Sequence, residues 1–159
     1  MKTSRKIFLS IPTMVLAVCI LSTVGVYAFR VDDMQKLKAT KQCTNCDLTG
    51  AYLVAMDLNG ANLLGTSLNN ANLSTANLSG ANLSYAILAN ANLTGADLNG
   101  ADLAHTNLCD TNLTAASLCY ANFTGAILNN TNLGGANLSG AIWIHGHKCK
   151  EGSIGQCNQ

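Results

Sequence analysis

A bulky apolar residue recurs at every fifth position from Leu48 to Trp143. A small residue, usually Ala, stands two positions before each one, so the repeating unit reads A-(N/D)-L-x-x. A period of five does not suit a helix, where steps of about 100° would scatter the leucines around the cylinder, and in a strand an odd spacing alternates between the two faces. The backbone must therefore turn once in every repeat.

Each repeat contains one short extended segment in which Ala and Leu point the same way, because residues two apart share a side. The Asn or Asp between them points in the opposite direction. Stacked repeats of this kind predict an all-β solenoid with a core of Leu and Ala and an exterior rich in amides. The period alone allows three, four or five sides to a coil.

Repeats such as Ala61-Asn62-Leu63 and Ala101-Asp102-Leu103 resemble those of the pentapeptide-repeat family, and the resemblance covers about 100 of the 159 residues. It implies a right-handed quadrilateral β-helix with four repeats in each coil. The twenty central positions then make about five coils, a rod roughly 24 Å long at the usual strand spacing. Ala is replaced at a few positions, which we expect to cause only local adjustment: Met56, Thr66, Thr106, Thr111 and Thr131.

The first 28 residues have the pattern of a signal peptide. Lys2, Arg5 and Lys6 precede an apolar run at 7–24, and Val26-Tyr27-Ala28 suits a signal-peptidase site. The alternative is an uncleaved anchor, in which residues 7–24 contact the membrane. Both interpretations place the rest of the chain outside the cytoplasm, and the family resemblance favours the periplasm or a thylakoid lumen.

The remaining chain divides into three parts. Residues 29–45 predict a cap or linker with a short helix after Asp32-Asp33. Residues 46–145 form the β-helix, and residues 146–159 form a cysteine-containing tail that we expect to fold over the last coil. Trp143, at the last central position, would help to cover that end. Caps at both ends would shield open backbone edges from strand addition.

Six of the seven cysteines remain after residue 28, an even number that suits an oxidising compartment. Cys43 with Cys46 and Cys149 with Cys157 lie at opposite ends of the predicted rod, so we expect a local disulfide in each cluster. Other connectivities stay open. The CxxC spacing of Cys43 and Cys46 also allows an alternative function, a thiol redox protein. Cys109 and Cys119 fall on opposite faces and are expected to be free thiols.

Charge is sparse along the repeats. Residues 42–147 contain no Lys or Arg, and their acidic residues are Asp47, Asp57, Asp97, Asp102 and Asp110. Some members of the family imitate DNA and inhibit DNA gyrase, which needs charge close to the duplex density of one per roughly 1.7 Å. The few aspartates make that function less favoured, and the absence of a basic patch argues against binding nucleic acid.

Irregular positions on the exterior are the candidates for contact with a partner. Tyr85 and His105 lie twenty residues apart in one column, and Ile87 and Ile127 occupy another column where Asn or Asp is usual. The regular Asn columns are expected to form amide ladders along the rod. An end-to-end or face-to-face homodimer is a further expectation.

No constellation of catalytic residues is apparent in the repeats, and a convex exterior offers no deep pocket. His145, His147 and Cys149 are potential metal ligands, but a tail alone is a weak site, so no metal or cofactor is predicted. The sequence therefore predicts an exported, non-enzymatic scaffold for protein interaction, with an unidentified protein partner. It does not specify the partner or the physiological role.

Overall fold

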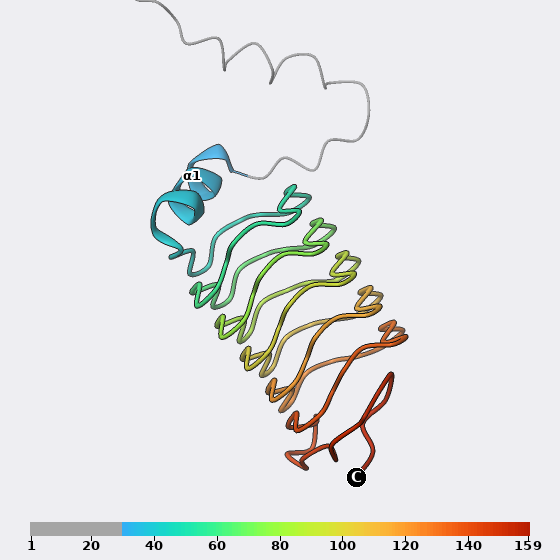
Figure 1. Cartoon of the computed structure of the whole chain (residues 1–159). Coiled ribbons are helices and arrows are strands. Elements are labelled where there is room, and N and C mark those ends of the chain that lie inside the picture. The colour runs from blue at the N-terminus through green and yellow to red at the C-terminus, as the bar shows by residue number, and fades with distance from the viewer. Residues whose placement is uncertain (1–29) are drawn as a thin grey trace, which may run out of the picture.

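The computed structural model describes residues 30–159, which wind into a rod of stacked coils (Figure 1). Parallel β-bridges join residues twenty apart along the rod, from Gln42 with Asn62 to Asn122 with Ile142. Because a bridge recurs every five residues, each coil has four sides of five residues. The predicted signal peptide or anchor, residues 1–28 with its apolar run 7–24, lies outside the described residues. Within residues 30–159, no helix is both long and apolar enough to cross a membrane.

The interior of the rod is a stack of leucines and alanines. Leu48 and every later central residue through Phe123 are no more than 1% exposed, and the small residues two positions earlier are nearly all buried with them. In the last coil, by contrast, the central residues Leu128, Leu133 and Trp143 are only partly buried. The Leu and Ala pattern therefore forms one continuous core that is less well covered at its C-terminal end.

Each five-residue unit satisfies its backbone donors in the same way. In the unit 71–75, the N–H groups of Asn72, Leu73 and Thr75 bond to backbone carbonyls of the neighbouring coils at 2.7–2.9 Å. The N–H of Ser74 instead bonds to the side-chain Oδ1 of Asn72 at 3.1 Å. Ala76, the first residue of the next unit, closes the turn by donating to the Leu73 carbonyl at 3.0 Å.

The side-chain acceptor explains why Asn or Asp precedes the central residue. Its Oδ1 accepts the N–H two residues ahead, a local turn that Asn and Asp favour, and the bond recurs in many units, as in Asn82 with Ser84 at 3.0 Å. Bonds between stacked amides are fewer; Asn122 donates to Asp102 at 3.0 Å and Asn92 to Asn72 at 3.4 Å. Amide ladders occur, but the recurrent role of these side chains lies within each turn.

The last residue of each unit turns the corner in the left-handed region of φ. Gly occupies many of these corners, and Asn70, Asn90 and Asn130 have φ between 56° and 60°. Gly and Asn tolerate this conformation better than other residues. The two variable positions of the repeat are thus not equivalent, because the second must adopt a positive φ.

Thr replaces Ala in the core without leaving a polar group unpaired. The hydroxyl of Thr106 donates to the carbonyl of Leu83 at 3.0 Å, and that of Thr111 donates to Leu88 at 2.8 Å. Both acceptors lie 23 residues earlier, on the preceding coil. The expected local adjustment therefore takes the form of an extra hydrogen bond between coils, and the fold is unchanged.

Helix α1 (Val31–Thr40) lies at the N-terminal end of the rod (Figure 1). The helix begins before Asp32-Asp33 and not after it, with Arg30 as the N-cap residue. Asp32 and Asp33 stand in the first turn, where negative charge is favourable, and Lys41 ends the helix with φ 54°. Its Leu37 is completely buried and its Met34 nearly so, both within the core of the rod. The helix therefore packs its apolar residues onto the first coil.

The sequence pattern places the start of the β-helix at residue 46. In the structure the regular coil starts one five-residue unit earlier and includes Cys43 as the central residue of that unit. Cys43 is fully buried, and its N–H bonds to the carbonyl of Asn62 at 2.7 Å, as a central Leu would bond. A cysteine in place of leucine hides this unit from a search for bulky apolar residues. Cys43 is disulfide-bonded to Cys46, which is also buried.

The tail after Trp143 turns back along the last coil as antiparallel bridges, Ile142 with Lys148 and Asn137 with Ile154. Leu138 donates to the carbonyl of Ser153 at 2.8 Å, and Cys149 donates to that of Ala141 at 2.8 Å. The tail therefore pairs with residues 136–143 of the last coil. No backbone hydrogen bond of the described chain joins the tail to residues 127–134, although Gly155 lies beside the Leu133 carbonyl.

Candidate functional site

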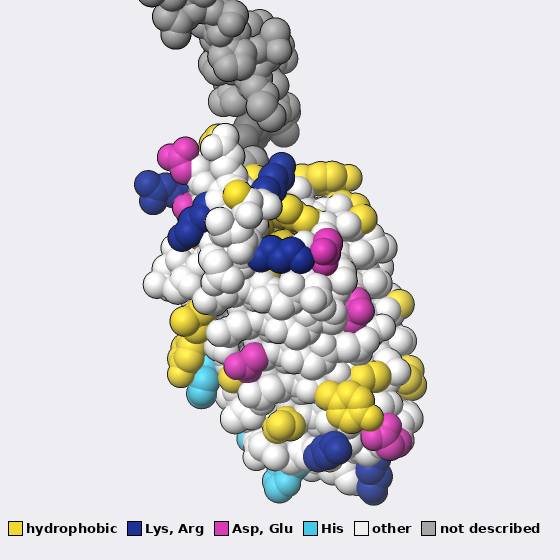
Figure 2. All heavy atoms as spheres, turned by 60° about the vertical axis from the view of Figure 1, so that its left-hand side comes forward, with side chains coloured by type: hydrophobic (Ala, Val, Ile, Leu, Met, Phe, Trp, Pro, Cys, Tyr) yellow, Lys and Arg dark blue, Asp and Glu magenta, His cyan; other side chains and the backbone are white. Residues whose placement is uncertain are grey.

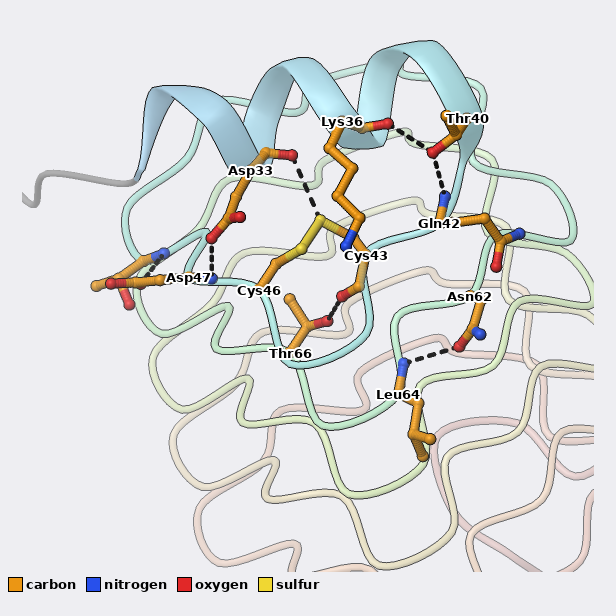
Figure 3. Close-up of a disulfide and its surroundings, with 11 residues drawn as sticks. Asp33, Lys36, Thr40, Gln42, Cys43, Cys46, Asp47, Asn62, Leu64 and Thr66 are labelled. Carbon is orange, nitrogen blue, oxygen red and sulfur yellow. Dashed lines mark hydrogen bonds between the residues drawn. A yellow bond between two sulfur atoms is a disulfide. The ribbon is translucent and has the colours of Figure 1, made fainter.

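The N-terminal cysteines form a disulfide beneath α1. Cys43 pairs with Cys46, and the two residues are 0% and 4% exposed. Figure 3 shows the bond between the helix and the first coil, with the Cys43 sulfur 3.4 Å from the carbonyl oxygen of Asp33. The Asp33 carboxylate also accepts the N–H of Asp47 at 2.9 Å. The bond thus lies within the junction of helix and rod, away from solvent.

The C-terminal cysteines form a second disulfide, between Cys149 and Cys157. Cys149 is 2% exposed and packs with the core, while Cys157 is partly buried against it. This bond closes the tail onto the covered half of the last coil. Cys109 and Cys119 are free thiols of intermediate exposure, and they lie two sides apart in the coil.

Tyr85 and His105 stack at one corner of the rod, with ring centroids 4.9 Å apart and an interplanar angle of 17°. Their φ angles are 59° and 57°, a conformation that is rare for bulky side chains. The His105 ring lies over Gly125, where an added Cβ would approach the Nδ1 atom within 2.6 Å. The absence of a side chain at Gly125 therefore leaves room for the stack.

Ile87 and Ile127 lie in the column beside this corner. Ile87 is bridged to Asn107, which is bridged in turn to Ile127, so a single Asn separates the two isoleucines. They are 40% and 48% exposed. Neither can accept the N–H two residues ahead as Asn would, and the N–H groups of Ala89 and Asn129 have no such side-chain partner among residues 30–159.

Tyr85, His105, Ile87 and Ile127, here named the aromatic corner patch, depart from the repeat in ways that do not favour the fold. A bulky residue at positive φ costs of order 1–3 kcal/mol, and each lost local hydrogen bond costs about 1 kcal/mol. The stacked rings recover part of this cost, whereas the exposed isoleucines recover none, and positions that break local rules are characteristic of functional sites. The patch is therefore the candidate functional site of the rod wall.

Most of the outer surface of the rod is polar and uncharged, as Figure 2 shows for one face. Among the described residues, Lys41 and Asp57 form an ion pair, with the Lys41 Nζ and the Asp57 Oδ2 2.9 Å apart. The hydrogen bond from Lys41, aided by the N–H of Asn59, lowers the pKa of the Asp57 carboxyl. Both side chains are exposed at the N-terminal end, so solvent screens this pair.

Two aromatic residues on the exterior were not singled out from the sequence. Tyr120 stands at another corner with φ 60° and has the Lys148 ammonium 5.7 Å from its ring centroid. Tyr52 is 74% exposed in the first coil. Tyr120 could have been found by asking which residues replace Gly or Asn at the last position of a unit.

No group of three or more His, Cys, Asp or Glu side chains within residues 30–159 is arranged to hold a metal ion. Cys149, one of the three tail residues considered as ligands, is bonded to Cys157 and has no free thiolate. His145 and His147 are exposed. The described residues therefore bring no metal centre together.

Comparison with known proteins identifies the repeats. Residues 42–74, 76–114 and 110–142 match the family model of pentapeptide repeats in 8 copies. A solved pentapeptide repeat protein from the Arabidopsis thaliana thylakoid lumen is 31% identical, with a TM-score of 0.51 over 64% of this chain and 68% of that one. Another, from Nostoc Pcc 7120, is 36% identical, with a TM-score of 0.55 over 58% of this chain and 78% of that one. Among curated proteins, no significant match was found.

Proposed function

Because the chain belongs to the pentapeptide-repeat family, whose solved members imply a right-handed quadrilateral β-helix, we propose that it is an exported, non-enzymatic scaffold that binds a partner protein. The observation that carries the proposal is the aromatic corner patch. Its four residues are costly to the fold and accessible to a partner. Aromatic residues are enriched where protein surfaces bind one another.

Export is supported by the sequence of residues 1–28, by two disulfides and by similarity to a thylakoid-lumen protein. Disulfides persist in oxidising compartments and are rare in reducing ones. The compartment is the periplasm or a thylakoid lumen, with anchoring by residues 7–24 as the alternative. Cell fractionation tests this part; recovery in the cytosolic fraction would contradict it.

Helix α1 and the C-terminal tail serve as caps on the two ends of the rod. The rod has about five coils, and α1 covers the first of them with Leu37 while the tail pairs with half of the last. Exposed strand edges invite pairing with other chains, and covering them keeps a solenoid soluble. In this proposal the caps maintain the rod, and the wall carries the binding function.

The test is to restore the repeat at the aromatic corner patch. The substitutions Tyr85→Asn, His105→Asn, Ile87→Asn and Ile127→Asn each introduce a residue that the repeat already uses at that position. The fold should therefore be kept, while crosslinking to the partner in intact cells is lost. Tyr120→Asn is the matched control, since Tyr120 has φ 60° and is 62% exposed at a different corner.

Partners are identified by crosslinking in cells, followed by mass spectrometry of the recovered complexes. A partner captured equally by the wild type and the fourfold variant would contradict the role of the patch. Loss of capture in the Tyr120→Asn control as well would contradict its specificity. Circular dichroism of each purified variant shows that the rod is still folded.

The alternative function, thiol redox chemistry through Cys43 and Cys46, is supported by their CxxC spacing and their bond. Reactive cysteines are usually accessible and have a lowered thiol pKa, whereas these two are nearly fully buried. Cys43→Ser separates the two functions. It abolishes thiol exchange if the protein is a redox catalyst, and loosens only the N-terminal end if it is a scaffold.

Gyrase inhibition by DNA mimicry is the least favoured alternative. The rod carries five aspartates between residues 42 and 147, and one of them, Asp57, is paired with Lys41. That density is far below the charge of a duplex. A DNA supercoiling assay with the purified protein tests this alternative, and inhibition would revive it.

A further inference from the structure

Exposed apolar side chains gather at the N-terminal end of the rod. Val31 of α1 is 52% exposed and Tyr52 on the first coil is 74% exposed, while Val54 and Met56 on the same coil are partly exposed. Figure 2 shows hydrophobic side chains together with Lys or Arg side chains at this end. The four apolar residues and Lys38, an exposed residue of α1, are here named the N-terminal shelf.

Three residues of the N-terminal shelf depart from the repeat. Tyr52 stands where the later coils have Asn, Val54 where the next three have Ser or Thr, and Met56 where they have Ala. Tyr52 cannot accept the N–H of Val54 as Asn would, and this N–H has no hydrogen-bond partner among residues 30–159. The outer surface is therefore more apolar at this end than along the same columns further down the rod.

The charged groups at this end leave cations available to an outside partner. The cations within residues 30–41 are Arg30, Lys36, Lys38 and Lys41, and the carboxylates on α1 and the first coil are Asp32, Asp33, Asp47 and Asp57. Asp33 and Asp47 each accept a backbone N–H at 2.9 and 3.1 Å, and Asp57 is paired with Lys41. Among the described residues of this end, three cations and Asp32 have no such partner within the rod. This balance favours an anionic surface.

The chain before α1 would bring a bilayer close to this end. The apolar run at 7–24, which lies outside the described residues, is separated from α1 by residues 25–30. A fully extended chain spans about 3.5 Å per residue, so this connection reaches at most about 20 Å. If residues 7–24 enter a bilayer, the N-terminal end of the rod therefore stays near the bilayer surface.

We propose that the N-terminal shelf binds the surface of a lipid bilayer that contains anionic headgroups. The side chains of Val31, Tyr52 and Val54 enter the boundary between headgroups and acyl chains, and Lys38 and Arg30 contact the anionic groups. Tyr is enriched at this boundary because its ring is apolar and its hydroxyl is polar. Lys and Arg bury their aliphatic stems there while their charges stay with water and anions.

The contact uses only α1 and the first coil, so it applies to a chain that keeps residues 7–24 and to one that is cleaved after Ala28. In an anchored chain the N-terminal shelf orients the rod on the membrane. In a cleaved chain it gives a reversible attachment, because a few apolar side chains and cations bind a bilayer weakly. The rod meets the membrane by its end, which leaves the aromatic corner patch free. The proposal therefore stands whether or not that patch binds a protein.

The experiment is photocrosslinking of the protein, in the form that cells produce, to vesicles of phosphatidylcholine with or without phosphatidylglycerol. A photoreactive phenylalanine analogue replaces Tyr52 or, as controls, Tyr85 or Tyr120, which are 61% and 62% exposed further along the rod. Mass spectrometry after irradiation measures the lipid adducts. Adducts should form at residue 52 and stay at background level at residues 85 and 120. Equal yields at all three positions, or background at all three, would overturn the proposal.

A charge variant tests the preference for anionic headgroups. Arg30→Glu with Lys38→Glu should lower the adducts at residue 52 about tenfold in vesicles that contain phosphatidylglycerol, and much less in phosphatidylcholine alone. Lys148→Glu with Lys150→Glu is the matched control on the tail and should leave the yield unchanged. An equal loss in both kinds of vesicle, or in both variants, would overturn the proposal.

An apolar variant tests whether the N-terminal shelf makes the contact or a tether alone holds it near the lipid. Tyr52→Asn with Val54→Ser introduces the residues that the next coil has at these positions, so the fold should be kept, as circular dichroism will show. With the photoreactive analogue at residue 31, this variant should lose most of its lipid adducts. Tyr85→Asn, the control on the rod wall, should keep them. A full yield in the double variant would overturn the proposal.

Crosslinking in intact cells tests the nature of the partner. The analogue at residue 52 should give lipid adducts there as well. Adducts to a protein in place of lipid would overturn the proposal. Because the vesicle assays contain no partner protein, their failure would not bear on the binding function proposed for the aromatic corner patch.

Discussion

Both ends of the rod expose core side chains and backbone edges, and different elements cover them at the two ends. At the N-terminal end, α1 places the fully buried Leu37 over the first coil, and Leu53 and Leu58 below it are buried as well. At the C-terminal end, an antiparallel tail pairs with one half of the last coil, and Leu128 and Leu133 remain partly exposed. A helix covers the core with side chains, whereas a strand covers mainly the backbone edge on which it lies.

This difference indicates distinct roles for the ends. The N-terminal end is closed by apolar packing, a buried disulfide and the bond from Asp47 to the Asp33 carboxylate. At the C-terminal end, the N–H groups of Leu128 and Leu133 have no hydrogen-bond partner among residues 30–159, and their side chains are partly exposed. Substitutions at matched positions can measure how far the two ends differ.

The largest effect is expected for Leu37→Ala. This side chain is completely buried between helix and rod, so its loss should lower the free energy of unfolding by about 2–5 kcal/mol. Val31→Ala is the control on the same helix, since Val31 is 52% exposed. Chemical denaturation followed by circular dichroism measures both. Similar effects of the two substitutions would contradict the role of Leu37 in covering the core at the first coil.

Removal of either disulfide should have the next largest effect on stability. Their cysteines are 3 and 8 residues apart at the N-terminal and C-terminal ends. By loop entropy alone, removal should cost about 2 kcal/mol for the Cys43→Ser/Cys46→Ser variant and about 2.5 kcal/mol for Cys149→Ser/Cys157→Ser. Limited proteolysis should cut the tail in the second variant and the region of α1 in the first. Cleavage at the same sites in both would contradict independent closure of the ends.

Leu133→Ala should have a smaller effect than Leu37→Ala, although both remove the same atoms. Because Leu133 is partly exposed, its loss should cost about 1 kcal/mol. Chemical denaturation followed by circular dichroism measures this value. A cost equal to that of Leu37→Ala would show that the C-terminal end is as well closed as the N-terminal end.

The smallest effect is expected for Asp57→Asn, which keeps the side-chain acceptor for Asn59 and removes only the charge that pairs with Lys41. The pKa of Asp57 is lowered in the folded protein. Its stabilisation is therefore present above the pKa of the unfolded carboxyl, about 3.9, and is lost as the pH falls through the folded value. Thermal unfolding should show a slight difference between the two proteins at pH 7, and this difference should shrink as the pH falls below about 3.9.

Several features of the fold and site follow from the sequence alone. The five-residue period predicted the solenoid and its core because side-chain direction in a short extended segment depends only on local geometry. Tyr85, His105, Ile87 and Ile127 were identifiable as exceptions to a regular pattern. Cys43 was not recognised as a central residue, because its place in the coil depends on a disulfide and on the helix above it.

The sequence by itself determined which residues face the core, because that depends on local side-chain direction. Which columns these residues form depends on the number of sides in a coil, which the bridges between residues twenty apart show. Only the tertiary structure decided what the polar residues do, since the bond from Asn72 to the N–H of Ser74 depends on the turn that the stacked coils impose. It also decided how the ends are covered. A tail with no repeat can pair with the last coil in many ways, and only the packed structure shows that it leaves Leu128 and Leu133 beside an open edge.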